Sequence, residues 1–148
     1  MAKQFVVRSL ERSDYDKGYL QLLGQLTDIG DVNRVAFNVA FDTISSNPLH
    51  RVFVIEDKGK IIGCITLFIE QKFARSCGRC GHIEDVVTDS SYRGKGLGKL
   101  VTDYAAQYAK QNGCYKVILD CSDKNVPFYE RCGFKKKENQ CALYFSKL

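Results

Sequence analysis

The segment HIEDVVTDSSYRGKGLGKL, residues 82–100, decides the fold, because it joins a strand pattern, a glycine-rich turn and the start of a helix. Residues 82–89 predict a strand, and residues 98–113 place apolar side chains at helical spacing. The turn between them, residues 93–98, is called the glycine loop below. A second apolar strand, residues 114–121, follows the helix. This order favours a parallel strand pair joined by a right-handed crossover.

The glycine loop has the properties of a phosphate-binding turn. The first N–H groups of a helix lack intrahelical partners, and the helix dipole adds partial positive charge there. Gly94, Gly96 and Gly98 carry no Cβ atom, so an anion can approach their main chain closely. Arg93 and Lys95 add formal charge. A tight turn with solvated basic side chains is the alternative interpretation.

The spacing of the glycines excludes two common nucleotide-binding patterns. It fits neither G-x-x-x-x-G-K-S/T nor G-x-G-x-x-G. It does fit R-x-x-G-x-G, in which successive backbone amides can wrap a pyrophosphate.

The rest of the chain predicts a mixed α/β fold in the order βααβββαβαβ. The apolar and β-branched patterns predict further strands at residues 4–10, 51–56, 61–73 and 141–145, with a hairpin across the turn DKGK. A first helix capped by Ser13 or Asp14, a second capped by Asp31 and a short one capped by Asn125 complete the pattern. We expect one domain, residues 1–148, with a central mixed sheet flanked by helices.

Composition narrows the function classes. The 148 residues are 45% apolar and 26% charged, with a net charge of +5. No apolar run approaches the roughly 20 residues of a membrane span, and the N-terminus lacks the apolar core of a secretory signal. The charge suits an anionic ligand as well as it suits nucleic acid. A basic nucleic-acid-binding module is an alternative, although no basic-aromatic strand motif supports it.

The seven cysteines predict free thiols in a reducing compartment, since their number is odd and no signal peptide precedes them. Cys77 and Cys80 have the spacing of a zinc knuckle, and His82 follows closely. A structural zinc site needs four ligands, and no second pair stands at a suitable distance. We therefore expect no metal cofactor.

The last three residues, Ser146-Lys147-Leu148, match a C-terminal address that peroxisomal import receptors recognise. The sequence thus predicts a peroxisome or a related glycosome as the location, and the cytoplasm if the tail is not free.

Two linked segments carry a family resemblance. CGHIEDVVTDSSYRGKGLGKL and CYKVILDCSDKNVPFYERCGF, with R-x-x-G-x-G opening a helix, resemble the GNAT acetyltransferase superfamily. The resemblance is strongest over residues 61–134 and is closest to members that acetylate glucosamine 6-phosphate. It implies the GNAT fold, acetyl transfer from acetyl-CoA to the 2-amino group of that sugar, and a homodimer whose subunits share residues near the sugar. The product would lead toward UDP-N-acetylglucosamine.

The resemblance also implies an acetyl-CoA site. Val86 and Val87 would offer main-chain groups to the pantetheine arm, where an N–H can polarise the thioester carbonyl. Tyr129 would protonate the departing thiolate, although a tyrosine of the core is the alternative. The residues implied for the coenzyme are Val86, Val87, Arg93, Gly94, Lys95, Gly96, Leu97, Gly98, Asn125 and Tyr129.

An acceptor site follows from the same resemblance. Asp120 ends an apolar strand, where a carboxylate is costly unless it is paired or used. By resemblance it orients the substrate amine and accepts its proton, which makes Asp120 and Tyr129 the catalytic pair. Glu84 and Asp85 are adjacent on a strand, so only one can point at the sugar unless the strand bulges.

Cations are needed for the sugar phosphate. The residues implied for the acceptor are Thr27, Lys72, Arg75, Glu84, Asp85, Tyr115, Lys116 and Asp120. One departure from the family concerns its phosphate-binding arginine in the last strand, where this chain reads Leu143-Tyr144-Phe145. Either Lys72, Arg75 or Arg79 compensates, or the phosphate binds more weakly.

Two other functions stay open on these residues. An acetyltransferase for a polyamine or a protein N-terminus would need carboxylates for its acceptor, whereas Lys72 and Arg75 favour an anionic one. An acyl-CoA sensor without activity would not need both Asp120 and Tyr129.

Overall fold

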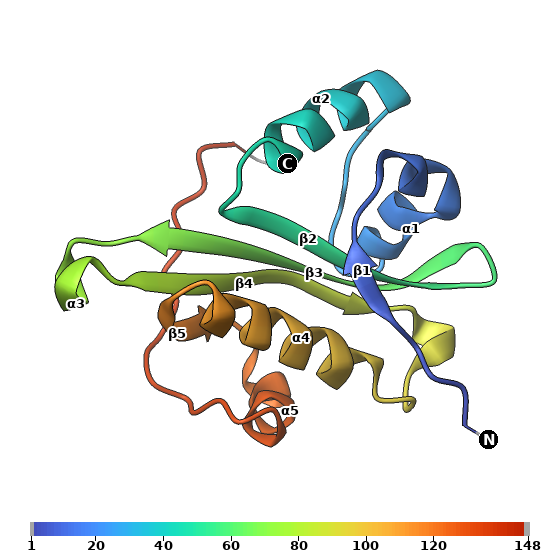
Figure 1. The fold of residues 1–148 in the computed structure, drawn as a ribbon. Helices are drawn as coiled ribbons and strands as arrows, with labels where there is room; N and C mark the ends of the chain where they lie inside the picture. The colour runs from blue at the N-terminus through green and yellow to red at the C-terminus, as the bar shows by residue number, and fades with distance from the viewer. Residues whose placement is uncertain (1, 147–148) are drawn as a thin grey trace.

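A five-stranded sheet runs through the centre of the computed structural model, which describes residues 2–146 (Figure 1). The strands, in spatial as in sequence order, are β1 (Val7–Ser9), β2 (His50–Asp57), β3 (Lys60–Gln71), β4 (Arg79–Thr88) and β5 (Cys114–Leu119). Neighbours from β1 to β4 are antiparallel, whereas β4 and β5 are parallel. The mixed sheet and the strand–helix–strand crossover confirm the predicted fold class.

Helices cover both faces of the sheet. They are α1 (Tyr19–Leu23), α2 (Arg34–Ser45), α3 (Ala74–Cys77), α4 (Leu97–Gln111) and α5 (Val126–Arg131), with 3₁₀ turns η1 (Arg12–Lys17), η2 (Ser90–Tyr92) and η3 (Asp123–Asn125). Figure 1 shows α1 and α2 on one face and α4 and α5 on the other. Among residues 2–146, none of these helices has the length and apolar character to cross a bilayer.

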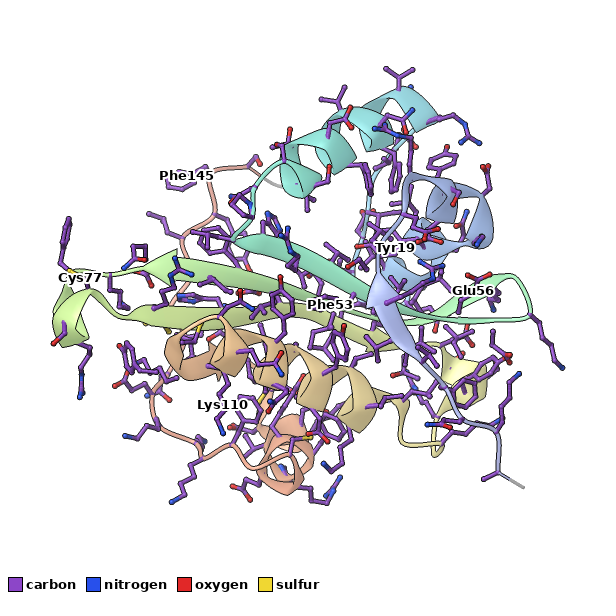
Figure 2. All side chains as sticks on the ribbon, viewed as in Figure 1. Tyr19, Phe53, Glu56, Cys77, Lys110 and Phe145 are labelled. Atoms are coloured by element: carbon purple, nitrogen blue, oxygen red, sulfur yellow. The ribbon has the colours of Figure 1, made fainter. Side chains whose placement is uncertain are left out.

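Each face of the sheet has its own apolar core. Phe53 packs toward α4, with its ring centre 4.9 Å from that of Tyr104 and 5.1 Å from that of Tyr108 (Figure 2). On the opposite face, Tyr19 and Leu22 pack over Val54. Because the central strands are buried on both faces, they read as nearly continuous apolar runs. The two cores fix β3, β4 and α4 relative to each other.

The two N-terminal helices differ from the sequence prediction in their boundaries. Gly18, with φ 83°, ends η1 and separates it from α1, so the predicted first helix is two short pieces. The predicted cap Asp31 is wrong, because the Asn33 side chain accepts the Ala36 N–H at 2.9 Å and starts α2 two residues later. A side-chain oxygen at that position satisfies an otherwise unpaired helix amide.

The predicted final strand at residues 141–145 is wrong. In the described part of the chain this segment has no regular secondary structure and pairs with no strand, and β5 pairs with β4 alone. Its side chains are open to solvent: Leu143 is 78% exposed, Tyr144 85% and Phe145 94%. The β pattern is present, but a strand also needs a neighbour for its N–H and C=O groups. The segment instead passes the β5 edge toward α2 (Figure 1).

Two buried carboxylates, Asp14 and Asp89, accept several hydrogen bonds. Those of Asp14 stabilise the N-terminal segment, and those of Asp89 stabilise the turn before the glycine loop. Asp89 accepts hydrogen bonds from Lys60 Nζ at 2.8 Å, the Ser91 N–H at 2.9 Å and Gln25 Nε2 at 3.2 Å. These bonds, that of Lys60 above all, hold the pKa of Asp89 well below its usual range. Burial alone would raise the pKa of Asp14, but two 2.8 Å bonds from Arg8 outweigh it and lower the pKa.

We expect these carboxylates to make the fold sensitive to acid. Their folded pKa values lie below the unfolded values of about 4, so their contribution is complete above that pH and is lost as the pH falls through the folded values. The free energy of unfolding, measured by urea denaturation between about pH 7 and pH 3, should therefore fall at the acid end. Asp89→Asn should lower it by about 1–3 kcal/mol at pH 7 and flatten its acid dependence. Asp31→Asn, at an exposed carboxylate, is the matched control; an equally steep acid dependence in Asp89→Asn would contradict the assignment.

Candidate active site

A cleft of about 810 Å³ opens where the pairing of β4 with β5 ends at Ile83 and Leu119. In open sheets with parallel strands, ligands bind at the carboxyl ends of those strands. The predicted residues that the structure brings together in the cleft are Thr27, Glu84, Asp85, Val86, Asp120, Asn125 and Tyr129. Residues from both substrate predictions, acceptor and coenzyme, thus line one space.

A β-bulge in β4 explains how adjacent residues line the same cleft. From the pair Thr66–Glu84 to the pair Cys64–Val87, β3 advances two residues and β4 three. Asp85 takes φ 50°, a left-handed conformation, to accommodate the extra residue. Glu84 and Asp85 can therefore both line the cleft. In a regular strand, adjacent side chains would point to opposite faces and only one of them could do so. A bulge also leaves main-chain groups outside the ladder, where a ligand can reach them.

Three carboxylates gather in this cleft. Burial raises the pKa of Glu84, and the nearby charges of Asp120 and Asp85 raise it further. Like charges held together disfavour full ionisation and attract a cation. The cluster can therefore bind an ammonium group and accept its proton.

Tyr129 lines the cleft from α5. Its ring centre lies 4.9 Å from that of Phe128 and 6.0 Å from that of Phe134, and Phe134 N–H donates to the Tyr129 carbonyl at 3.0 Å. Burial raises the pKa of the Tyr129 phenol to about 12. The hydroxyl therefore stays protonated at neutral pH and can act as a proton donor.

The glycine loop opens α4 as predicted. Gly94 and Gly96 both have φ 77°, which favours glycine, and a Cβ on either would meet nothing within 4 Å. Gly96 caps α4 without any side-chain hydrogen bond. The first-turn amides are thus left for another acceptor. An exposed loop without a side-chain cap, at the start of a 15-residue helix, fits a diphosphate group.

Leu97 fixes the glycine loop to the sheet, because its side chain is buried in the core against β3 and β4. Gly98 lies close to α5: a Cβ there would approach Phe128 Cζ to 3.0 Å. The side chains of Arg93 and Lys95 are exposed, and Lys95 Nζ lies 5.0 Å from the centre of the Tyr92 ring. The loop is therefore fixed by apolar packing on one side and open on its charged side.

The structure does not bring four of the predicted acceptor residues into the cleft. Arg75 and Lys116 lie over the Tyr115 ring at 5.5 and 5.6 Å, and Lys72 Nζ lies 3.3 Å from Glu70. Lys116 precedes Asp120 by four residues, which is about 13 Å along an extended chain. These cations form a separate group at the start of β5. Val87 also stays outside, in the core over α1.

Several residues of the cleft were missed from the sequence. Cys121 and Ser122 follow Asp120 directly, and their place after a parallel strand was a usable signal. Gln140 reaches the cleft from the unpaired C-terminal segment, and no local pattern shows that return. Tyr144 also lines the cleft, and the family resemblance had pointed to its neighbourhood, where other members have a phosphate-binding arginine.

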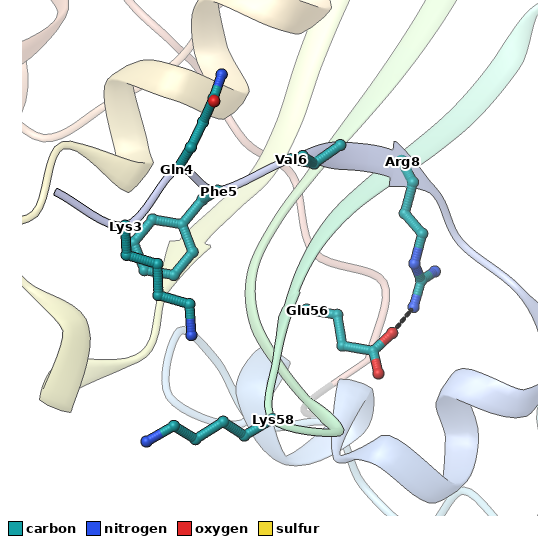
Figure 3. A pocket seen from close by; sticks show the side chains of 7 residues that line it. All are labelled: Lys3, Gln4, Phe5, Val6, Arg8, Glu56 and Lys58. Carbon is teal, nitrogen blue, oxygen red and sulfur yellow. Dashed lines mark hydrogen bonds and ion pairs between the residues drawn. The ribbon is translucent and has the colours of Figure 1, made fainter. Parts of the chain in front are cut away.

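A smaller hollow of about 350 Å³ lies beside β1 (Figure 3). Lys3, Lys58 and Arg8 line it, but Arg8 is held by Glu56 at 2.6 Å and by Asp14 at 2.8 Å. The charge of Arg8 is therefore balanced by these two carboxylates. The hollow shares no lining residue with the cleft and has no comparable set of reactive groups.

Comparisons with known proteins agree with this geometry. The model of the acetyltransferase (GNAT) family matches residues 12–134. A glucosamine 6-phosphate N-acetyltransferase of Arabidopsis thaliana is 49% identical over 148 residues, covering 98% of this chain and 99% of the relative. One from Trypanosoma brucei brucei is 43% identical, covering 93% of each chain.

Solved structures give the same result. The crystal structure of glucosamine-6-phosphate N-acetyltransferase from Arabidopsis thaliana has a TM-score of 0.95 at 48% identity, covering 97% of this chain and 100% of that one. A Trypanosoma brucei acetyltransferase has a TM-score of 0.89 at 40% identity, covering 96% and 100%. The family match, the near-complete coverage and the shared fold together show that the chain belongs to the acetyltransferase (GNAT) family.

Proposed function

We infer that the protein transfers the acetyl group of acetyl-CoA to the 2-amino group of D-glucosamine 6-phosphate. The products are N-acetylglucosamine 6-phosphate and CoA, and we place the step ahead of UDP-N-acetylglucosamine synthesis. The observation that carries this proposal is the cleft lined by three carboxylates and by Tyr129, whose neighbour Phe128 lies against the glycine loop at Gly98. The near-complete similarity to relatives named for this acceptor supports the choice of sugar.

The acetyl-CoA side of the site would bind and orient the coenzyme. We propose that the free amides of the glycine loop bind its diphosphate, with Arg93 and Lys95 adding charge. The pantetheine arm then runs along the bulged part of β4. There a main-chain N–H near Val86 polarises the thioester carbonyl, and losing such a donor typically costs about 10²-fold or more in rate.

The acceptor half supplies the nucleophile. At neutral pH the sugar amine is largely an ammonium ion, which Glu84, Asp85 and Asp120 attract. Asp120 takes one proton, and the freed nitrogen attacks the thioester carbon. The C–N bond forms and leaves the nitrogen positively charged, so it loses its second proton to solvent. The C–S bond breaks, and the thiolate takes the Tyr129 hydroxyl proton. Solvent restores both groups.

Of the groups that the reaction needs, those that would bind the sugar phosphate are the least complete. Lys72, Arg75 and Lys116 lie outside the cleft, around Glu70 and the Tyr115 ring near the start of β5. Tyr144, in the cleft, adds an uncharged hydroxyl. We propose that the phosphate points from the cleft toward these cations.

An acceptor panel with acetyl-CoA tests the function. Thiol release should be rapid with glucosamine 6-phosphate and at least about tenfold slower, in kcat/KM, with glucosamine, since each tenfold step needs about 1.4 kcal/mol of phosphate contacts. Spermidine and a peptide N-terminus should give little release. Equal rates with the phosphorylated and plain sugars, or no release with either, would reject the proposal.

We also propose a homodimer. The apolar C-terminal side chains are exposed, as are Tyr115 and Ile118 on the edge strand β5, and an unpaired edge invites a further strand. Tyr144 belongs to that segment and lines the cleft, so a second subunit would meet the acceptor side. Light scattering should give twice the 16.7 kDa chain mass, and a single-chain mass at micromolar concentration would oppose it.

Finally, we propose import into a peroxisome or glycosome through the C-terminal tripeptide. Ser146 is exposed at the end of the exposed segment, while Lys147 and Leu148 lie outside the described residues. A fluorescent N-terminal fusion should enter the organelle, and the same fusion without the tripeptide should stay in the cytosol; identical distributions would exclude the signal.

A further inference from the structure

Three potential metal ligands meet on the sheet face that is turned away from α4. Glu70 on β3 pairs directly with Cys80 on β4, and His82 follows Cys80 by two residues on the same face. The carboxylate oxygen, the thiol sulfur and the imidazole nitrogen all lie within 4.8 Å of one another. Sheet pairing, rather than sequence spacing, brings them together.

Contacts around Glu70 leave one of its oxygens for this cluster. His82 Nε2 lies 2.9 Å from Glu70 Oε1, while Lys72 Nζ lies 3.3 Å from Glu70 Oε2. The buried Cys80 sulfur has only a weak 3.7 Å contact with the Gly81 carbonyl among the described residues. Oε1, Nε2 and Sγ therefore face one another without a strong competing partner for the sulfur.

A tetrahedral ion would need only local side-chain movements to bind these three atoms. At bond lengths of about 2.3 Å to sulfur and 2.0–2.2 Å to nitrogen and oxygen, zinc holds its ligand atoms about 3.3–3.8 Å apart. The oxygen–nitrogen pair, 2.9 Å apart, must open by a few tenths of an ångström, and the sulfur, which lies within 4.8 Å of both atoms, must come to about 3.6 Å from each. We propose that Glu70, Cys80 and His82 form a binding site for a thiophilic divalent metal ion, zinc above all.

Access and charge also suit an ion. Glu70 is 39% exposed and His82 32%, so an ion can enter between them, and its fourth position faces solvent. Binding releases the Cys80 thiol proton to water and leaves a thiolate and a carboxylate, which balance the two charges of the ion. Lys72 can keep its contact with Oε2, although its positive charge weakens the site relative to four-ligand structural sites.

The site differs from the knuckle that the sequence suggested. Cys77 and Cys80 have the right spacing, but α3 carries Cys77 to the exposed tip beyond the sheet (Figure 2). Glu70, ten residues before Cys80 and invisible to a cysteine pattern, takes its place across the strand pair. None of the three ligands lines the proposed active cleft.

Cobalt(II) is the probe for the test, because it replaces zinc and absorbs visible light when bound by a thiolate. Titration of the reduced full-length protein should give a thiolate-to-cobalt charge-transfer band that saturates at one ion per chain, and zinc should remove it. Cys80→Ser should abolish the band. His82→Gln, at a partly exposed position that should not disturb folding, should weaken binding at least about tenfold.

Cys77→Ser is the matched control, since it removes a nearby exposed thiol and should leave the titration unchanged. A band that survives in His82→Gln with unchanged affinity, or one that disappears in Cys77→Ser, would overturn the proposal and indicate adventitious binding by exposed thiols. Absence of any band in the unaltered protein would overturn it as well. If Cys80→Ser does not fold, the comparison of His82→Gln with Cys77→Ser decides.

Discussion

Replacing Tyr129 by phenylalanine should lower kcat by about 10²–10⁴-fold while KM for acetyl-CoA stays within about twofold. The substitution removes one hydroxyl and keeps the ring that packs on Phe128 and Phe134. Without that proton donor the thiolate must leave unprotonated, whereas the contacts of the glycine loop with the coenzyme are untouched. Steady-state kinetics with both substrates varied would separate the two effects.

The pH dependence of the rate tests the role of Tyr129 in a second way. Because burial raises the pKa of Tyr129 to about 12, the donor form persists through the alkaline range, and the rate should not fall there through loss of this proton. Tyr104→Phe is the matched control, since Tyr104 lies on α4 against Phe53 and outside the cleft. Unchanged kcat in Tyr129→Phe would remove the residue from the mechanism.

Replacing Asp120 by asparagine should lower kcat/KM for glucosamine 6-phosphate by about 10²–10³-fold. Asparagine keeps the shape of the side chain but can neither accept a proton nor balance the ammonium charge. Part of the rate should return at high pH, where the sugar amine loses its proton to solvent before it binds. A rate deficit that stays constant with pH would instead indicate a purely structural role.

Asp123→Asn is the control for this substitution. Asp123 lies three residues further on, in η3, and pairs with Lys136 at 2.9 Å on the surface. It carries the same chemical change outside the cleft. We expect it to retain full activity at every pH, and a loss equal to that of Asp120→Asn would mean that general charge, rather than position, determines the rate.

The predictable part of the fold is the part with strong local signals. The α4 helix, the glycine loop and the parallel strands around them follow from periodicity and glycine placement, and the structure has them within a few residues. The prediction of a strand at residues 141–145 was wrong. The segment has a strand-like pattern, but no strand in the described chain pairs with it. Pairing is a property of the assembled sheet, which no local window contains.

The candidate site divides in the same way. Asp120, Tyr129 and the glycine loop stand in segments whose motifs are specific, and they lie where the cleft and α4 begin. The bulge at Asp85 was not predictable, since HIEDVVTD contains no glycine or proline to mark it. Lys72 and Arg75 depend on how the turn after β3 folds back, and they remain apart from the cleft.

The close contact between Gly98 and Phe128 has a consequence for the choice of acyl group. Because a Cβ at Gly98 would approach Phe128 Cζ to 3.0 Å, a larger residue there would push α5, and with it Tyr129, away from the start of α4. In the proposed function, this packing sets where the Tyr129 side chain stands relative to the glycine loop, whatever acyl chain the coenzyme carries. Selection between acetyl and longer chains would then depend on the apolar side chains that line the cleft, among them Ile83 and Leu119.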